Sequence, residues 1–466
     1  EYRKIASEYP SDFLIVASGN HDEFDVEEYN SKDHYILQYC DFYKNNEIYK
    51  KYENFLISRV NYEDIEIFVM NPYHYPTVRA GVGYYMYLTT EMLDIIEKIL
   101  SEQTYNTTRL LITHFSTSFS NRNVYSTSGK TLSEILTSSN IVSTIAGHSH
   151  AYRVIHRNSS LEVHSPSINP GRRSGQNYGY ILIDNGYFSY HMSKLNENRL
   201  KAVLAYPIEK KYLSKMTDFS RQKFDESEIR VVTFSEDSKL NISVTCTNED
   251  DGNRQNGFLQ FQRVIRSNQS LYSIPLKNIC GELRGNDRKS FTLNFSGDWS
   301  YTTEFIVGES VTFDKEIIED DLNLYTATFS VGFILYIFVL FVWCPFISPP
   351  KFCSNVNMWI SGATMNSMVK YFGLFFGFLP MKSRIYSNLS KKCQFLYFIV
   401  AVSPLFLPIS IMKIGQNHFG LILSFGYYLN GFVMDVWGFD LFALFVVLVL
   451  VPSTIVSSPF YHLNRR

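Results

Sequence analysis

The chain has 466 residues, and its formal net charge at pH 7 is only -2. This length allows two or three domains, while the near-neutral charge without a long basic run argues against a nucleic-acid partner. The chain begins at Glu1, and its first residues are typical of the end of a helix that leads into a strand. We therefore expect that an N-terminal part of the protein is missing from this chain.

Residues 1–198 alternate short apolar runs with a helical pattern, which predicts an α/β layered domain. The helical pattern covers residues 88–100, where apolar residues recur with charged residues between them. The turn signal Asn185-Gly186 separates two β-type runs and predicts a hairpin. The predicted strands cover residues 13–17, 109–113, 140–146, 161–164, 180–184 and 187–191.

Residues 202–315 differ in character, because short β-type runs are separated by polar turns and no useful helical pattern occurs between them. This pattern predicts an all-β, Ig-like sandwich. Cys246 and Cys280 both fall in this region, and we expect either a disulfide between them or two buried thiols. The predicted strands cover residues 229–235, 240–247, 258–264 and 291–295.

Residues 322–466 are rich in apolar and aromatic residues, and residues 326–347 contain no charged residue. A run of this length is typical of a helix that spans a membrane. Together with further apolar runs it predicts a transmembrane helical domain of about four or five spans. Those further runs cover residues 365–379, 395–412, 419–434 and 441–460.

The distribution of charge and the glycosylation sequons predict on which side of the membrane residues 1–321 lie. Acidic residues precede the first predicted span and Lys351 follows it, which favours the cytosol for the following end. Asn-x-Ser/Thr triplets occur before that span, so we expect a multi-pass glycoprotein whose residues 1–321 are lumenal or extracellular. The triplets begin at Asn106, Asn158, Asn241, Asn268 and Asn294.

Three short histidine motifs follow predicted strands of the first region. They are Gly-Asn-His-Asp at residues 19–22, Thr-His at 113–114 and Gly-His-Ser-His at 147–150. In open α/β sheets, ligands bind outside the carboxyl ends of strands. Neutral imidazoles with carboxylate and carboxamide oxygens suit zinc, iron or manganese, and a pair of such ions promotes phosphoester hydrolysis. The three motifs in this order therefore predict a phosphoesterase metal centre.

These motifs resemble the later blocks of the calcineurin-like metallophosphoesterase family. The resemblance implies a layered β-sandwich flanked by helices, which here would be incomplete, and two divalent metal ions. It further implies that His21 protonates or stabilises the leaving oxygen and that Asp22 orients His21. By this resemblance, His150 would bind one ion, and the other three implied ligands would bind the second ion. The implied metal ligands are Asn20, His114, His148 and His150.

Two earlier blocks of that family, Asp-x-His and Gly-Asp-x-x-Asp, have no counterpart upstream of Gly19. We therefore expect this polypeptide alone not to assemble the two-metal site. The order of a phosphoesterase domain, a β-sandwich and several spans is similar to that of transmembrane protein 62-like proteins. Residues 161–163, the pair Arg172-Arg173 and the hairpin at residues 181–189 also resemble that family.

The predicted function is that of a membrane-anchored, metal-dependent phosphoesterase that is inactive as this fragment. The complete protein would hydrolyse a phosphomono- or diester with a metal-bound hydroxide. The alternative is a catalytically silent membrane scaffold or receptor, in which the phosphoesterase fold and the β-sandwich bind a partner. We expect three spare histidines to be surface or core residues rather than ligands: His74, His156 and His164.

Overall fold

Strands predominate among the residues that the computed structural model describes. The chain divides into two compact units, one of which contains Glu1–Asp22, His34–Tyr73 and Met86–Glu319. The other contains Glu23–Asp33, His74–Tyr85 and Asp320–Arg466. The structure describes residues 15–24, 26–28, 34, 49–52, 56–75, 77, 86–102, 107–117, 120, 124–150, 152–157, 160–167, 176–184, 186–194, 201–214, 227–234, 240–249, 252–266, 269–281, 289–296, 300–307, 392, 408, 410–414, 418–423, 426–429 and 432–434.

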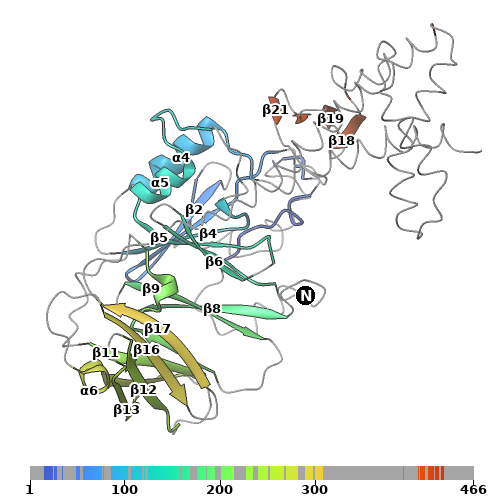
Figure 1. Cartoon of the computed structure of the whole chain (residues 1–466). Helices are drawn as coiled ribbons and strands as arrows, with labels where there is room; N and C mark the ends of the chain where they lie inside the picture. Colours follow the sequence, from blue (N-terminus) through green and yellow to red (C-terminus); the bar gives the residue numbers. More distant parts are fainter. Residues whose placement is uncertain are drawn as a thin grey trace, which may run out of the picture. The chain divides into compact units, whose positions relative to one another are not determined.

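The first unit contains a mixed sheet of seven short strands. They are β1 (Tyr49–Tyr52), β2 (Ile57–Tyr62), β3 (Ile65–Met70), β4 (Thr108–Thr113), β5 (Ile141–Ala146), β6 (Arg153–Arg157) and β7 (Ser160–His164). Their order across the sheet is β1-β2-β3-β4-β5-β7-β6. Figure 1 labels β2, β4, β5 and β6 of this sheet. Strands β3, β4, β5 and β7 run parallel, and the other three pair antiparallel on the two sides. The carboxyl ends of the four parallel strands therefore meet at one edge of the sheet.

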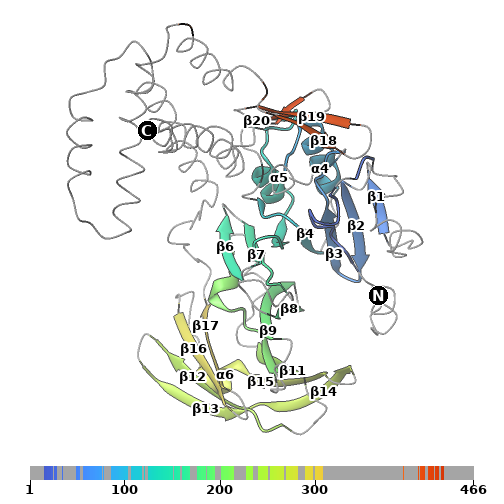
Figure 2. The ribbon, with the colours of Figure 1, turned by 90° about the vertical axis from the view of Figure 1, so that its right-hand side faces the viewer.

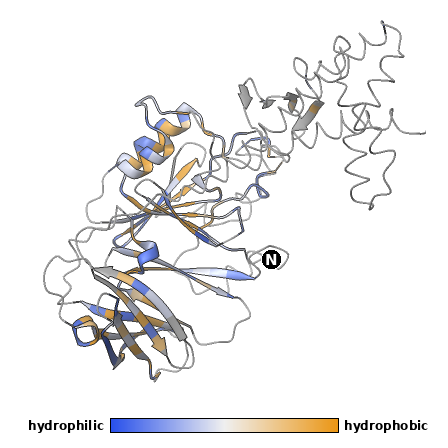
Figure 3. Cartoon of the chain, viewed as in Figure 1, coloured by the Kyte–Doolittle hydropathy of each residue, from blue (hydrophilic) through white to orange (hydrophobic). Residues whose placement is uncertain are grey.

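Two helices, α4 (Thr90–Ser101) and α5 (Leu132–Ser138), cover one face of this sheet. Each begins at a threonine whose hydroxyl accepts a backbone N–H of the first turn, and at α5 Thr131 and Glu134 form a reciprocal capping box. Both helices carry apolar and polar faces (Figure 3). The apolar side of α4, which includes Ile96, packs in one core with Phe68 and Leu111 of the sheet. The predicted helix at residues 88–100 is confirmed in type, with a shift at its start.

The opposite face of the sheet is covered by a hairpin of β8 (Asn177–Asp184) and β9 (Tyr187–Lys194). Gly186 has a φ of 84°, so it adopts the left-handed conformation that the two-residue turn requires. The predicted Asn185-Gly186 hairpin is confirmed by the pairing of Asp184 with Tyr187. Tyr190 of β9 packs in one core with Leu110 and Val163 of the sheet. Alternate residues of β4 thus serve two cores, Leu110 on this face and Leu111 on the helical face.

His191 on β9 predicts a pH dependence of folding stability. Its side chain is buried, its Nε2 lies 3.0 Å from the carbonyl oxygen of Leu204, and burial lowers its pKa below the ordinary value. The nearby charge of Lys211 also lowers this pKa, whereas Glu209 partly opposes the shift. Since the unfolded chain binds this proton more readily, stability is lost as the pH falls below about 6.5.

We expect His191→Gln to reduce the loss of folding stability at low pH, because glutamine keeps a donor for the Leu204 carbonyl and does not titrate. The free energy of unfolding should then depend less on pH below about 6.5, by at most about 1.4 kcal/mol per pH unit. Urea unfolding of both proteins at about pH 7.5 and about pH 5.5 measures the difference. Equal pH slopes for the two proteins would show that His191 is not neutral in the fold.

Two four-stranded antiparallel sheets follow in the first unit. One has the order β10-β11-β15-β14 and the other β13-β12-β16-β17 (Figure 2). The strands are β10 (Lys201–Tyr206), β11 (Glu228–Phe234), β12 (Ser243–Asn248), β13 (Arg254–Phe258), β14 (Gln260–Arg266), β15 (Gln269–Pro275), β16 (Lys289–Ser296) and β17 (Ser300–Val307). One buried cluster that includes Val231, Val244 and Phe305 joins the two sheets. The single strand predicted at residues 258–264 is wrong, because Leu259 is not in a strand and divides β13 from β14 of the other sheet.

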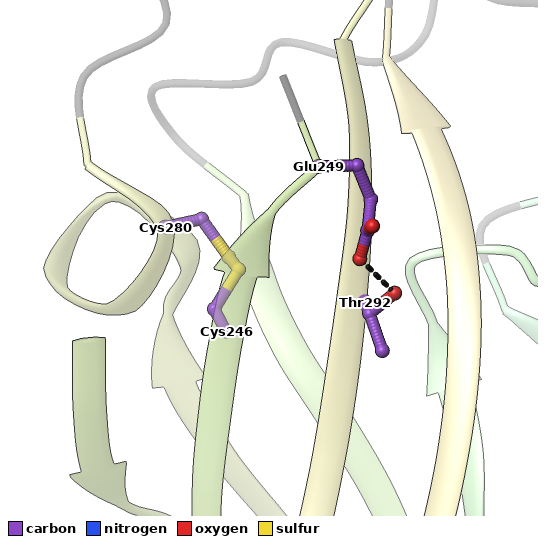
Figure 4. Close-up of a disulfide and its surroundings, with 4 residues drawn as sticks. All are labelled: Cys246, Glu249, Cys280 and Thr292. Carbon is purple, nitrogen blue, oxygen red and sulfur yellow. Dashed lines mark hydrogen bonds between the residues drawn. A yellow bond between two sulfur atoms is a disulfide. The ribbon is translucent and has the colours of Figure 1, made fainter. Parts of the chain in front are cut away.

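A disulfide joins Cys246 of β12 to Cys280, the last residue of the short helix α6 (Leu276–Cys280) (Figure 4). The two Cα atoms are 5.4 Å apart, within the usual range for a bridge. Of the two alternatives that the sequence allows, the bridge is therefore the one present. It closes a loop with a sequence separation of 34, which restricts the unfolded chain and so favours the folded sheet pair.

In the second unit, a four-stranded antiparallel sheet lies where the sequence predicts membrane spans. Its strands are β18 (Ser410–Ile414), β19 (His418–Leu423), β20 (Gly426–Leu429) and β21 (Phe432–Met434). Leu423 pairs with Gly426, and Leu429 pairs with Phe432, so only two residues separate β19 from β20 and β20 from β21. The second pair of intervening residues is Asn430-Gly431, a sequence that favours a tight hairpin and interrupts the apolar run.

The predicted fold class and location are both wrong on these observations. Strands dominate the described residues, and all the regular structure described within the predicted spans at residues 395–412 and 419–434 is strand. Within the described part of the chain, no helix has the length and apolar character needed to cross a membrane. This contradicts the multi-span helical domain and the multi-pass location. The apolar runs at residues 326–347, 365–379 and 441–460 lie outside the described residues, as do Arg172 and Arg173.

Candidate metal centre

The second and third histidine motifs lie side by side at the carboxyl edge of the parallel strands. His114 directly follows β4, and residues 147–150 directly follow β5. In the sheet, Thr113 pairs with Ala146, and the N–H of Gly147 donates to the carbonyl oxygen of His114 at 2.9 Å. The parallel pairing therefore brings two motifs together that are separated by more than thirty residues of sequence.

The first motif lies at the same edge of the sheet, but among the described residues it does not follow a strand. Its predicted strand at residues 13–17 is wrong where the structure describes it, because residues 15–17 are not in a strand, while residues 13 and 14 lie outside the described part. Side chains beyond the end of β3 hold this segment instead: Ser18 N–H donates to Asn71 Oδ1 at 3.1 Å, and the Tyr73 hydroxyl donates to the Ser18 carbonyl at 2.8 Å. This anchoring places the next residues, Gly19 and Asn20, beside His114.

Three of the four predicted metal ligands converge on one point. Nε2 of His114 lies 2.9 Å from Oδ1 of Asn20 and 3.1 Å from Nδ1 of His148. The two imidazole planes meet at 77° with their centroids 5.0 Å apart, so the rings approach edge to face. The site thus gathers one carboxamide oxygen and two imidazole nitrogens, one from each of the three motifs.

Hydrogen bonding alone does not satisfy these three atoms. A neutral imidazole nitrogen carries either one hydrogen or one lone pair, so Nε2 of His114 cannot form a full hydrogen bond to both neighbours. Among the residues that the structure describes, the other polar atom of the Asn20 amide, Nδ2, has no hydrogen-bond partner, although Asn20 is only 2% exposed. Burying such an amide without partners is costly. A cation between the three converging atoms removes the conflict at Nε2 of His114, because Oδ1 of Asn20 and the two imidazole nitrogens then all present lone pairs to it. This donor set suits a borderline divalent metal, whereas the Nδ2 group of Asn20 is a donor and takes no part in it.

The protonation state of His114 also suits a metal ligand. Burial, together with the neighbouring positive charges of His148, His150 and His21, lowers its pKa to about 3. At neutral pH the imidazole is therefore uncharged and keeps a lone pair for coordination. The same electrostatic effect shows that the other three histidines of the motifs lie near His114.

Two residues of the third motif are held in a strained backbone conformation. His148 has a φ of 56° and His150 a φ of 52°, so both are in the left-handed region. This region costs a residue with a Cβ roughly 1–2 kcal/mol, and such strain is concentrated at functional sites. The two imidazoles consequently leave the backbone in directions that an extended or helical chain would not give them.

Phe115 is a supporting residue that the sequence did not single out. Its ring is fully buried, and its centroid lies 5.0 Å from the centroids of both His114 and His148. It thereby fixes two of the three converging side chains from one side. The signal available in the sequence was its place directly after His114, at the end of an apolar strand.

The remaining predicted site residues, His21, Asp22 and His150, are not among the three converging donors. His21 and Asp22 are exposed, and Asp22 Oδ2 accepts the Gly19 N–H at 2.8 Å, which closes the turn of the first motif. His150 lies near enough to lower the pKa of His114, while the two short contacts of His114 Nε2 are with Asn20 and His148. Among the described residues, no group of three or more His, Cys, Asp or Glu side chains is arranged to hold a metal ion. The converging set has only two such residues, because its third donor is an asparagine.

Gly19 provides a test of how tightly the first motif fits. A Cβ at Gly19 would lie 3.1 Å from Cε1 of His114 and 3.2 Å from Oδ2 of Asp22. We expect Gly19→Ala to displace the His114 ring and weaken zinc(II) affinity by about 10-fold, comparable with the loss of a residue that orients a ligand. Calorimetric titration measures this affinity.

The matched control is Gly147→Ala, whose Cβ would lie at an ordinary 3.4 Å from Nδ1 of His114. We expect this variant to bind zinc(II) like the original protein. If both variants bound alike, the close approach at Gly19 would have no role in placing His114.

Comparison with known proteins adds no independent assignment. No protein-family model matches the sequence. No curated protein matches it at a significant level either.

Proposed function

We propose that this chain carries the metal-binding core of a metal-dependent phosphoesterase. The single observation that carries the proposal is the convergence of Asn20 Oδ1, His114 Nε2 and His148 Nδ1 within 3.1 Å of the central His114 atom. These residues would hold one divalent zinc, iron or manganese ion. The order of the three motifs, which resembles that of calcineurin-like metallophosphoesterases, supports a phosphoester as the substrate.

Different residues of this chain would have different roles in the reaction at this site. When bound, the ion supplies a Lewis acid that lowers the pKa of water and screens the phosphate charge. His21 is exposed next to the buried donors, so its imidazole can reach a phosphate group and donate a proton to the leaving oxygen. Asp22 would act on this step indirectly, because its carboxylate holds the turn that carries His21. His150 is the one predicted ligand that would serve a second ion.

The test is hydrolysis of two chromogenic esters, p-nitrophenyl phosphate and bis(p-nitrophenyl) phosphate. The missing Asp-x-His and Gly-Asp-x-x-Asp blocks predict an inactive fragment, but we propose that one ion held by Asn20, His114 and His148 suffices for slow hydrolysis. The chelator-treated full chain should therefore be inactive, and manganese(II), zinc(II) or iron(II) should restore a low rate of hydrolysis. We expect His148→Ala to reduce the restored rate by more than about 100-fold, the upper end for residues that only orient a ligand. His156→Ala is the matched control, since it removes a histidine of β6 outside the converging set.

The possible outcomes separate the candidate functions. Hydrolysis that survives chelation, or that His148→Ala leaves unchanged, would contradict the proposal. A protein that binds the metal but hydrolyses neither ester would instead support the alternative of a catalytically silent scaffold.

A further inference from the structure

Two buried polar residues lie on β7, next to the candidate metal centre but outside its converging donors. Glu162 and His164 are 1% and 0% exposed. Because side chains two apart on a strand share a face, the two meet, and Glu162 Oε1 lies 2.6 Å from His164 Nε2. The sequence alone predicts that His164 is a core or surface residue, and it assigns no site role to Glu162.

Glu162 is bonded to the loop that follows His114. Its Oε1 accepts the Ser116 hydroxyl in addition to His164, and its Oε2 accepts both the hydroxyl and the backbone N–H of Thr117. The bond from the Thr117 N–H is 3.1 Å long. Ser116 and Thr117 stand only two and three residues after His114, so the carboxylate fixes the loop on which His114 lies.

His164 is bonded to the loop that carries the other histidines. Its Nδ1 lies 3.1 Å from the hydroxyl oxygen of Ser149, which stands between His148 and His150. Because an ionised carboxylate only accepts, Nε2 of His164 donates to Glu162, and the Nδ1 atom of the same ring shares a second hydrogen bond with the Ser149 hydroxyl. The pairing of His164 with Ala146 across the sheet keeps this ring next to the start of the same loop.

The four links form one continuous chain, Ser116/Thr117–Glu162–His164–Ser149, between the two loops. A buried carboxylate is tolerated only when its partners satisfy it, and this one accepts hydrogen bonds at both oxygens, from Ser116 and His164 at Oε1 and from Thr117 at Oε2. Apolar residues of similar volume would fill this space at no greater cost in stability. They could not, however, hold the Ser149 hydroxyl between two histidines that are both in the strained left-handed conformation.

We propose that Glu162 and His164 are positioning residues, which hold the two histidine loops in the geometry that binds the metal ion. This inference rests on the proposed function, since it assumes that Asn20, His114 and His148 are ligands. It adds residues that act through the ligands rather than on the metal. It also assigns Ser149 as the point at which the buried pair controls the third motif.

Ser149 allows the sharpest test, because it is only half-buried and its hydroxyl can be removed without opening the core. We expect Ser149→Ala to weaken cobalt(II) affinity by about 10-fold and to change the cobalt(II) visible absorption spectrum. Ser149→Thr retains the hydroxyl and should preserve both. Glu162→Gln should weaken affinity by about 10- to 100-fold, because its amide group cannot accept all the hydrogen bonds of the carboxylate.

Cobalt(II) titration of the full chain, with circular dichroism to confirm folding, separates the outcomes. If Ser149→Ala and folded Glu162→Gln bind cobalt(II) with the affinity and spectrum of the original protein, the positioning role is wrong while the metal site stands. If Ser149→Thr loses as much affinity as Ser149→Ala, the hydroxyl link is also wrong. If the original protein binds no cobalt(II), both this inference and the proposed function fail. Binding without ester hydrolysis would overturn the proposed function alone.

Discussion

His114→Ala is expected to abolish high-affinity zinc(II) binding. His114 Nε2 is the atom shared by both short contacts of the site, at 2.9 Å to Asn20 and 3.1 Å to His148, so its removal leaves two donors without a common neighbour. We expect affinity to fall by more than about 100-fold, because the loss of a ligand exceeds the 10–100-fold loss of a residue that only orients one. Zinc content after dialysis, measured by mass spectrometry, gives the direct result.

Thermal unfolding provides a second measure of the same variant. A metal that binds the folded chain raises its melting temperature, so zinc(II) should stabilise the original protein and not His114→Ala. His156→Ala serves as the control, and it should retain the zinc-induced increase. A zinc-dependent increase of equal size in His114→Ala would mean that the stabilising zinc binds elsewhere.

The second large effect concerns stability and lies at the other end of the same strands. Arg109 and Glu66 are 6% and 1% exposed and form an ion pair, with Arg109 Nε 2.7 Å from Glu66 Oε2. Arg109 also donates to the carbonyl oxygens of Leu100 and Ser139, at the carboxyl ends of α4 and α5. One guanidinium therefore joins β3, β4 and both helices.

We expect Arg109→Met to lower the free energy of unfolding by about 3–5 kcal/mol, because it leaves the buried Glu66 carboxylate without this partner. Lys210→Ala is the matched control, since Lys210 and Glu304 are 3.4 Å apart but roughly half-exposed, and such pairs contribute about 0–1 kcal/mol. Urea unfolding compares the two variants. A loss below about 1 kcal/mol for Arg109→Met would show that Arg59, which also pairs with Glu66, suffices alone.

His114→Ala and Arg109→Met should act independently, because the two residues lie at opposite ends of the parallel strands. Arg109 pairs with Glu66 near the start of β4, whereas His114 follows its end. We therefore expect folded Arg109→Met to keep its zinc(II) affinity. Metal binding and stability would then be separable properties of one sheet.

The sequence predicted those helices, strands and turns that a pattern over a few neighbouring residues specifies. The periodic apolar residues of α4, the apolar run of β5 and the Asn-Gly turn between β8 and β9 each specify structure over a few neighbouring residues. The position of His114 at a strand end could be predicted for the same reason. Its distance from Asn20 could not, because it depends on Asn71 and Tyr73 holding a segment that is not in a strand.

The errors occurred where the structure depends on pairing between distant segments. Phe258 and Phe261 belong to different sheets, and no local pattern shows that the chain changes sheet at Leu259. The apolar residues 419–434 were long enough for a helical span, yet Asn430-Gly431 divides them into paired strands. A tight-turn signal inside an apolar run was the evidence that should have decided between helix and hairpin.

The buried pair on β7 illustrates what a single strand can and cannot reveal. Glu162 and His164 alternate with apolar residues, so their shared face was visible in the sequence. Their partners Ser116, Thr117 and Ser149 come from two other loops, and only the fold brings them together. The resemblance to metallophosphoesterases identified residues that would contact the metal, but not those that would hold these contacts in place.

The most direct test of the metal centre is anomalous X-ray diffraction at the zinc edge from crystals of the full chain grown with zinc(II). We predict an anomalous peak about 2.0–2.2 Å from Asn20 Oδ1, His114 Nε2 and His148 Nδ1. A zinc peak bound elsewhere, with these three atoms still in contact and no peak between them, would contradict the assignment of Asn20, His114 and His148 as ligands of one ion.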